Sequence, residues 1–359
     1  MTEKISVAVL YGGKSTEHEV SVHSAQTVCR LLRQSGKYDV LPVFINKQGF
    51  WFLQTQCGFA APDDRPVTPV ISPEGSLFLP QENVFLRPQV YFPVLHGSNG
   101  EDGTIQGLLE TLDAAYVGCG VLASAWAMDK EAAKAAAREE GVPVLPYQKI
   151  SRGTAYDKAA LEAWAAQTGY PVFVKPVRLG SSVGVTKVLS AETLHQAVAF
   201  ALRFDTDALV EKGVENPREV FCGLLGEGEN LRSSLCGELK NPSGGFFDYQ
   251  AKYITQGGCE TSVPADLPPQ TQQEIRRCSE RIFKALRGSG LARADFLVGQ
   301  DGKVWFSEIN TIPGLSETSL YPQLFEASGV PYPQVLDELI SLALQVHRRR
   351  ATLAMERAG

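Results

Sequence analysis

The chain has 359 residues, a length at which two or three domains of roughly 100 to 200 residues are expected. Lysine and arginine together number 34 and aspartate and glutamate 40, so the formal net charge is −6. Because a phosphate backbone is bound by a clustered basic surface, this balance argues against a nucleic-acid-binding protein. A hydrophobic fraction of 44% and a charged fraction of 21% are typical of a folded globular protein.

The sequence contains no apolar run near the roughly 18 residues that a membrane helix requires, and its first residues lack a cationic leader. We therefore expect a cytosolic protein without a membrane partner. The seven cysteines are odd in number and widely spaced, and none forms a CxxC pair, which argues against a disulfide framework or a zinc ribbon. We expect buried free thiols.

The first third of the chain alternates between two patterns. Short apolar β-type runs and segments with helical spacing are found, in order, at residues 5–11, 21–32, 39–46, 90–95 and 103–112. This alternation predicts parallel strands joined by crossover helices. Residues 54–89 are rich in proline and polar side chains, and we expect them to form excursions on the surface of this unit.

The remaining sequence predicts two further units. An alanine-rich segment from residue 121 predicts a helix through residue 140 and suggests a boundary near residue 125. Residues 170–188 carry two β-type segments around glycines and predict an antiparallel hairpin with a glycine-rich tip. A further short strand is expected at 208–212, a third region begins at 219–225, and an amphipathic helix is expected at 332–350. The domains are therefore expected at 1–125, 126–215 and 216–359.

Two segments imitate nucleotide-binding motifs. Residues 13–15 read like the end of a P-loop, but the glycine required five residues before Gly13 is Ala8. Residues 118–123 fit the loose dinucleotide pattern, but they lie late in their domain instead of after its first strand. A P-loop is excluded, and the dinucleotide interpretation is disfavoured.

Two further patterns suggest hydrolases. His18 and His23 flank a pattern similar to that of zinc proteases, but their spacing is five residues instead of four, which turns the second imidazole away from the first. Residues 180–184 read GSSVG, a loose match to the short G-x-S-x-G pattern of a nucleophile elbow. No metal is predicted at the histidines, and a serine hydrolase is weakly supported.

Residues 291–310 predict a β-hairpin with a polar face. Asp301-Gly302 between two alternating runs is typical of a two-residue hairpin loop. With that loop, four polar residues share one face and four apolar residues share the other. Asp295 then faces Glu308 and Arg293 faces Asn310, while Ala292, Ala294, Phe296 and Val298 lie on the opposite face.

Two carboxylates beside an amide form an oxygen-rich set suited to Mg²⁺. Like charges opposite each other are destabilising unless a cation or a protonation change offsets them, which favours a metal over a merely solvated face. Arg293 would lie beside this metal. It could stabilise an oxyanion or form a salt bridge with Asp295 or Glu308, and the two roles are compatible.

Residues 175–185 place a lysine at the end of a β-type run just before a glycine-rich loop. Backbone N–H groups of such a loop can approach a ligand closely, and Ser181 and Ser182 add hydroxyls, so the loop suits a phosphate cover; the alternative is a mobile surface loop. With a magnesium site nearby, ATP becomes the common ligand. Lys130 and Lys175 are candidate phosphate-binding cations, and Glu211-Lys212 are candidates for contacting adenine and ribose.

Taken together, the motifs resemble the ATP-grasp superfamily and, within it, the D-alanine-D-alanine ligases. The similar segments span nearly the whole chain: GGKSTEHEVS (12–21), HGSNGEDGT (96–104), MDK (128–130), VKPVRLGSSVGV (174–185), EKG (211–213), FFDYQAKY (246–253), ARADF (292–296) and EINTIPGLSETSL (308–320). The resemblance implies an α/β fold, α+β in parts, in which an N-terminal parallel-sheet domain precedes two ATP-grasp domains that clamp ATP.

The resemblance also implies roles for individual residues. Glu17 would hold the ammonium group of the first D-alanine and form a triad with Ser181 and Tyr253. His96 and Glu101 match a segment near that substrate. Residues in the ATP site would be Lys130, Lys175, Ser182, Glu211, Lys212, Val214 and Glu219, and the metal ligands would be Asp295, Glu308 and Asn310.

The resemblance also implies which residues take part in the acyl-transfer step. Arg293 and the Gly314 N–H match the oxyanion hole of the family, Ser319 and Leu320 match the site of the second substrate's carboxylate, and Lys252 would reach the transferred phosphate. One departure from the pattern is Leu179, where some relatives have an acidic residue, which places any charged role at that position in doubt.

The implied reaction is ATP-dependent ligation of two D-alanine molecules through a D-alanyl phosphate, for peptidoglycan precursor synthesis. It would use Mg²⁺ or Mn²⁺, as two ions, in a cytoplasmic homodimer. One alternative is a ligase of the same fold whose second substrate is D-serine or D-lactate; Lys252-Tyr253 resembles the D-alanine pattern. The other alternative is a non-catalytic nucleotide-binding regulator.

Overall fold

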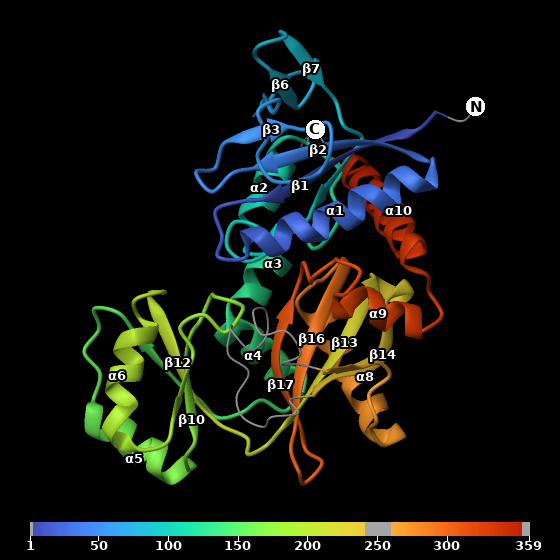
Figure 1. Cartoon of the computed structure of the whole chain (residues 1–359). Coiled ribbons are helices and arrows are strands. Elements are labelled where there is room, and N and C mark those ends of the chain that lie inside the picture. The colour runs from blue at the N-terminus through green and yellow to red at the C-terminus, as the bar shows by residue number, and fades with distance from the viewer. Residues whose placement is uncertain (1–2, 241–259, 354–359) are drawn as a thin grey trace, which may run out of the picture.

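The structure is a computed structural model that describes residues 3–240 and 260–353 (Figure 1). Two residues expected at the site, Lys252 and Tyr253, lie outside this range. None of the helices in the described ranges is both long enough and apolar enough to cross a membrane.

The N-terminal sheet has a parallel centre, as the alternating pattern predicts. Its strands lie in the order β4 (Arg65–Pro66), β3 (Trp51–Leu53), β2 (Tyr38–Ile45), β1 (Ile5–Gly12) and β8 (Val90–Pro93). β1 pairs in parallel with β2 and with β8, and the crossover helix α1 (His18–Ser35) packs on β1 and β2. Helix α2 (Thr104–Thr111) follows β8. The strands and helices expected in this part of the chain are confirmed.

Residues 54–89 are more than the surface excursion that their composition predicts. They include a small antiparallel sheet of β5 (Thr68–Pro69), β6 (Leu77–Leu79) and β7 (Val84–Leu86). Leu77 and Leu79 are fully buried in one cluster with Leu10 and Tyr91 of the main sheet. The expected surface excursion is therefore present, and a few of its apolar residues also cover the main sheet.

The alanine-rich segment forms two helices instead of one. Helix α3 (Val121–Met128) ends at Asp129, whose backbone is extended, and α4 (Lys130–Glu139) begins directly after it. The Asp129 carboxylate accepts a hydrogen bond from the Ala132 N–H at 3.0 Å and so caps α4. This cap places Lys130 at the first turn of a new helix.

The central sheet contains the predicted glycine-rich hairpin. Its strands lie in the order β11 (Thr186–Val188), β10 (Val172–Pro176), β12 (Asp207–Lys212) and β9 (Tyr147–Ser151), and all neighbours are antiparallel. Helices α5 (Lys158–Thr168) and α6 (Ala191–Ala201) pack on this sheet through a separate apolar cluster. In Figure 1 they lie on its outer side, away from α4.

The C-terminal sheet is also antiparallel. Its strands lie in the order β15 (Glu260–Ser262), β14 (Arg232–Lys240), β13 (Arg218–Gly226), β16 (Gly290–Val298) and β17 (Val304–Asn310). A 3₁₀ turn, η1 (Gly228–Asn230), joins β13 to β14. Helices α8 (Pro269–Ala285), α9 (Leu320–Ala327) and α10 (Tyr332–Ala351) pack around the sheet.

The β16–β17 hairpin differs from its prediction at the loop but agrees with it at the site. Gly299 N–H bonds to Lys303 O at 2.9 Å, so three residues form the loop instead of Asp301 and Gly302 alone. Phe296 therefore pairs with Phe306, one position away from the expected partner. A register shift directly beyond this pair restores the predicted pairing of Asp295 with Glu308 and of Arg293 with Asn310. The apolar face packs as expected, with Ala292, Ala294, Phe296 and Val298 all buried.

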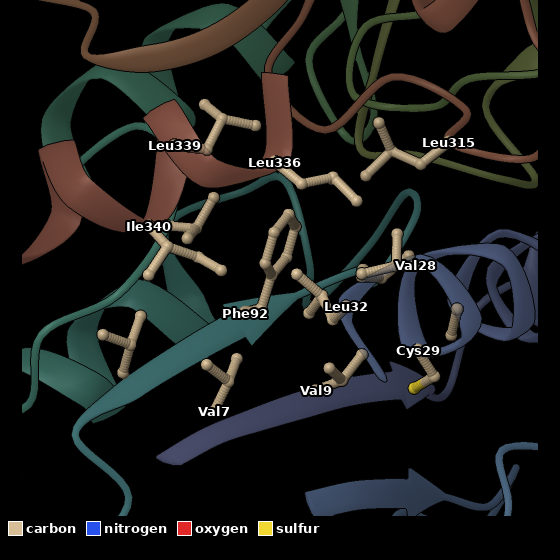
Figure 2. Packing of buried hydrophobic residues seen from close by; sticks show 14 of the residues in the cluster. Val7, Val9, Val28, Cys29, Leu32, Phe92, Leu315, Leu336, Leu339 and Ile340 are labelled. Atoms are coloured by element: carbon tan, nitrogen blue, oxygen red, sulfur yellow. The ribbon is translucent and has the colours of Figure 1, made fainter. Parts of the chain in front are cut away.

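Helix α10 completes the core of the N-terminal unit. Its buried face shares one apolar cluster with β1, β8 and α1, so residues from the two ends of the chain pack together (Figure 2). Figure 2 shows Leu336, Leu339 and Ile340 of α10 beside Phe92 of β8. The amphipathic helix expected at 332–350 is confirmed.

The expectation of buried free thiols holds for most cysteines in the described ranges. Cys29, Cys119, Cys222, Cys236 and Cys278 are buried and free. Cys57 is free but only half-buried, and Cys259 lies outside the described residues.

Replacing Leu339 by alanine tests whether α10 is part of this core. Leu339 is buried, and truncation of a buried leucine removes apolar contacts and leaves a cavity, so we expect the free energy of unfolding to fall by about 2–5 kcal/mol. Denaturant unfolding measures it. The control is Leu189→Ala, because Leu189 is 69% exposed. Equal losses in both variants would contradict the packing.

Candidate active site

Two loops from different sheets meet at Glu17. Glu17 precedes the first residue of α1, and its carboxylate accepts a hydrogen bond from the Ser181 hydroxyl in the glycine-rich loop. Ser181 and Ser182 both have left-handed backbones, with φ of 53° and 57°, a costly conformation for serine that is found at functional sites. The sequence-predicted contact between Glu17 and Ser181 is therefore present.

Gly97 makes room for this contact. Its φ is +73°, and a Cβ atom there would lie 2.6 Å from Glu17 Oε2, so a larger residue would displace the carboxylate. The loop that carries Gly97 begins at His96 and also includes Glu101. Three segments thus converge on the Glu17 carboxylate.

His96 and Glu101 both form hydrogen bonds with the backbone of Ile312, in the loop after β17. His96 Nδ1 is 2.8 Å from Ile312 O, and Glu101 accepts hydrogen bonds from Ile312 N–H at 2.8 Å and from Gly97 N–H at 2.9 Å. Burial lowers the pKa of His96, which favours the neutral ring. Burial and the nearby Glu17 carboxylate raise the pKa of Glu101 to about 8. Both residues therefore join the N-terminal unit to the loop after β17.

The polar face of the β16–β17 hairpin carries the predicted metal ligands. Arg293 donates two hydrogen bonds to Asp295, both at 2.7 Å, and Asn310 donates a third at 3.2 Å. Glu308 forms an ion pair with Lys130 at 3.1 Å. Each carboxylate is thus neutralised by a different cation.

These donors fit a hard divalent ion. Two carboxylates in cross-strand register beside an amide oxygen offer ligands of the type that Mg²⁺ binds. A small cavity of about 20 Å³ adjoins them. It is lined by Glu101, Ala127, Met128, Lys130, Gly180, Glu308, Ile309, Asn310 and Thr311.

Lys130 ties the glycine-rich loop to this cavity. Its ammonium donates to Leu179 O at 2.6 Å, and its backbone N–H donates to Val177 O at 3.2 Å. Arg178 lies between those two residues. It forms ion pairs with Asp129, with Asp207 at the start of β12 and with Asp205 just before that strand. The base of the loop is therefore held firmly although its tip carries small residues.

A buried carboxylate between two lysines adjoins the loop. Glu211 forms ion pairs with Lys175 at 2.5 Å and with Lys134 at 2.6 Å. Burial alone would raise the pKa of Glu211, but the two ammonium groups outweigh it, so this pKa lies below its usual value. Burial lowers the pKa of the Lys134 ammonium to about 8.

Sequence reasoning missed Lys134. The available signal was its position four residues after Lys130 in an alanine-rich helix, which places both lysines on one helix face. Lys134 is completely buried and also donates to Phe306 O at 3.3 Å. It therefore joins β12 of the central sheet to β17 of the C-terminal sheet.

The other predicted residues lie in two regions: around the β12–β13 connection, and between β17 and the start of α9. Lys212 ends β12, Val214 lies between β12 and β13, and Glu219 is in β13. Gly314 lies in the loop after β17, where Ser319 directly precedes α9 and Leu320 is its first residue.

Lys134→Met tests the buried ion pairs. It leaves Glu211 with one cation instead of two, so we expect the free energy of unfolding at pH 7 to fall by about 3 kcal/mol. Lys149→Met removes a half-exposed ion pair with Glu131 and is the control, with an expected loss below about 1 kcal/mol.

The pH dependence of the same variant gives a second readout. Because the pKa of Lys134 is about 8 in the folded chain and 10.5 ordinarily, the unfolded chain holds more protons between these values, and the wild-type free energy of unfolding gains a component that rises with pH. Lys134→Met lacks it, so the difference from wild type widens by about 1–3 kcal/mol from pH 8 to 10.5. Parallel curves would contradict this.

Two family models match the chain. Residues 6–119 match "D-ala D-ala ligase N-terminus" and residues 137–341 match "D-ala D-ala ligase C-terminus". A D-alanine--D-alanine ligase of Thermoanaerobacter sp. (strain X514) is 42% identical over 358 residues, which cover 97% of this chain and 99% of that protein.

Solved structures agree with this match. The D-alanine-D-alanine ligase from Coxiella burnetii is 34% identical with a TM-score of 0.85, covering 98% of this chain and 97% of that one. The VanG D-Ala:D-Ser ligase from Enterococcus faecalis is 34% identical with a TM-score of 0.84, covering 95% of this chain and all of that one. The expected ATP-grasp fold is confirmed, and the chain belongs to the D-alanine-D-alanine ligase family.

Proposed function

We propose that this chain is an ATP-dependent ligase that joins two D-alanine molecules into D-alanyl-D-alanine for peptidoglycan synthesis, acting in the cytoplasm as a homodimer. The observation that carries the proposal is the hydrogen bond between Glu17 and Ser181. It brings a carboxylate suited to an amino acid's ammonium group against the loop suited to phosphates. Tyr253 would complete this contact as a triad.

ATP would lie between the central and C-terminal sheets. Lys130 and Lys175, which already bond to the site's backbone and carboxylates, would contact its phosphates, with Ser182 in the covering loop. Glu211, Lys212, Val214 and Glu219, which follow the β12–β13 connection, would contact the adenine and ribose.

Asp295, Glu308 and Asn310 would hold the metal. Mg²⁺ or Mn²⁺, as two ions, would neutralise charge on the phosphate oxygens when bound. Arg293 and Lys130, which are paired with the two carboxylates, would then be available to the reacting groups. Lys252 would reach the transferred phosphate.

The first step is attack of a D-alanine carboxylate oxygen on the γ-phosphorus of ATP, which breaks the bond to ADP and forms an acyl phosphate. Positioning and charge neutralisation by the lysines would supply most of the acceleration. His96 and Glu101 would keep the loop beside this substrate in place through their bonds to Ile312.

In the second step the amine of another D-alanine attacks the acyl carbon. Arg293 and the Gly314 N–H would stabilise the tetrahedral oxyanion before inorganic phosphate leaves. Ser319 and Leu320 stand at the N-terminus of α9, where backbone N–H groups favour an anion, and would hold the carboxylate of the second substrate.

A coupled assay tests the substrate. We expect phosphate release from ATP with D-alanine alone, because one amino acid serves both positions, together with stoichiometric dipeptide. D-Serine is the strongest competing second substrate, since a D-Ala:D-Ser ligase shares the fold at 34% identity. Product analysis with D-serine or D-lactate added identifies the acceptor. No turnover with D-alanine alone would refute the assignment.

Glu308→Gln separates a ligase from a nucleotide-binding regulator. It replaces one carboxylate oxygen by an amide nitrogen, which cannot be a metal ligand, so we expect kcat to fall by about 100-fold or more with the fold retained. Glu326→Gln, on the exposed part of α9, is the control. Removal of the metal by EDTA should abolish turnover in wild type. Unchanged ATP turnover in Glu308→Gln would favour the regulator.

A further inference from the structure

We propose that the hydroxyl groups of Ser24 and Tyr332 are positioning groups for acyl transfer: they fix the backbone of Leu315 from two sides and thereby hold the neighbouring Gly314 N–H in place. This inference rests on the proposed function, which gives Gly314 its role. Neither residue belongs to a motif, and neither lines the cavity beside the metal ligands.

Ser24 lies on α1 and is completely buried. Its Oγ is 3.1 Å from Leu315 N and 3.0 Å from His96 Nε2. Since a carbonyl oxygen only accepts, His96 donates from Nδ1 to Ile312 O, and in the neutral ring Nε2 must accept. The Ser24 hydroxyl therefore donates to His96 and accepts from Leu315 N–H. Each donor in this series of three hydrogen bonds is thus paired with an acceptor.

Tyr332 forms a hydrogen bond with the backbone carbonyl of Leu315. Its hydroxyl donates to Leu315 O at 2.7 Å from the first turn of α10. The Leu315 side chain is completely buried in the N-terminal core, and Figure 2 shows it to the right of Leu336 of α10 and above Val28 of α1. Both backbone polar groups and the side chain of Leu315 are thus fixed by elements from the two ends of the chain.

Gly314 stands between the two fixed points of the loop. Ile312 is held two residues before it by His96 and Glu101, and Leu315 directly follows it. Space at Gly314 is also limited, because a Cβ atom there would lie 2.8 Å from Ser319 Oγ. The loop therefore has little freedom to move the Gly314 N–H relative to the second-substrate site.

Such precision matters for an oxyanion donor. A displacement of about 1 Å in a reacting geometry costs on the order of 100-fold in rate, and loss of an oxyanion donor costs about 10²–10³-fold in kcat. A buried hydroxyl hydrogen bond, in contrast, makes only a modest net contribution to stability. The two hydroxyls should therefore affect acyl transfer far more than folding.

The test compares Ser24→Ala and Tyr332→Phe with matched controls. Ser279→Ala removes a completely buried hydroxyl of another helix, α8, that donates to Ile275 O at 2.8 Å. Tyr321→Phe removes a buried tyrosine hydroxyl that donates to Leu224 O at 2.9 Å. All four variants are measured for thermal midpoint, for steady-state kinetics, and by rapid quench with γ-labelled ATP and D-alanine.

We expect similar small losses of thermal midpoint in all four variants. Ser24→Ala and Tyr332→Phe should lower kcat for dipeptide formation by about 10- to 100-fold, with an unchanged KM for ATP and first-turnover acyl phosphate formed at the wild-type rate. Ser279→Ala and Tyr321→Phe should keep wild-type kcat. If Ser24→Ala does not fold, the nearly isosteric Tyr332→Phe decides.

Two results would overturn the inference: kcat values of the two variants equal to those of their controls, or acyl phosphate formation slowed as much as dipeptide formation. Failure of the proposed function is a different result. A wild-type enzyme that turns over ATP with D-alanine but forms no dipeptide would refute that function, and the inference would fall with it.

Discussion

The Glu211 carboxylate, buried in the central sheet, imposes the charge arrangement on which the rest of the site depends. An ionised carboxylate can stay buried only if cations approach it closely, and two lysines do so, from β10 and from α4. Since α4 also packs on β17, the lysine that satisfies Glu211 fixes the distance between the two sheets. One turn earlier, the same helix presents Lys130 to Glu308 and to the glycine-rich loop. A single helix thereby aligns the phosphate-binding loop with the metal ligands.

Local sequence patterns predicted much of this arrangement because the relevant information is local. Alternation along β16 and β17 assigned Asp295 and Glu308 to one face, and that assignment survived an incorrect loop length because a bulge lies between the loop and the site. The alternation of strands and helices, which is also a local pattern, predicted the parallel centre of the first sheet. Errors occurred where a single residue redirects the chain, as Asp129 does by ending one helix and capping the next.

The remaining parts of the site depend on contacts between distant residues. Ser24 is separated from Leu315 by 291 positions, and no pattern in either segment predicts the hydrogen bond between them. His96 and Glu101 were recognised by family resemblance as substrate residues, but their bonds to Ile312 became visible only once the first and third sheets were placed together. Lys134 looked like an ordinary helix lysine because its burial is created by β12 and β17.

The shared core of α10 and the first unit has a consequence for biosynthesis. On the ribosome, the apolar faces of β1, β8 and α1 emerge well before the α10 residues that cover them, Val335 to Ala343. The N-terminal unit therefore cannot bury this surface until α10 has left the exit tunnel, and the surface stays exposed until then. Nascent chains that stop before α10 would retain this exposed apolar surface and become substrates for chaperones and proteases.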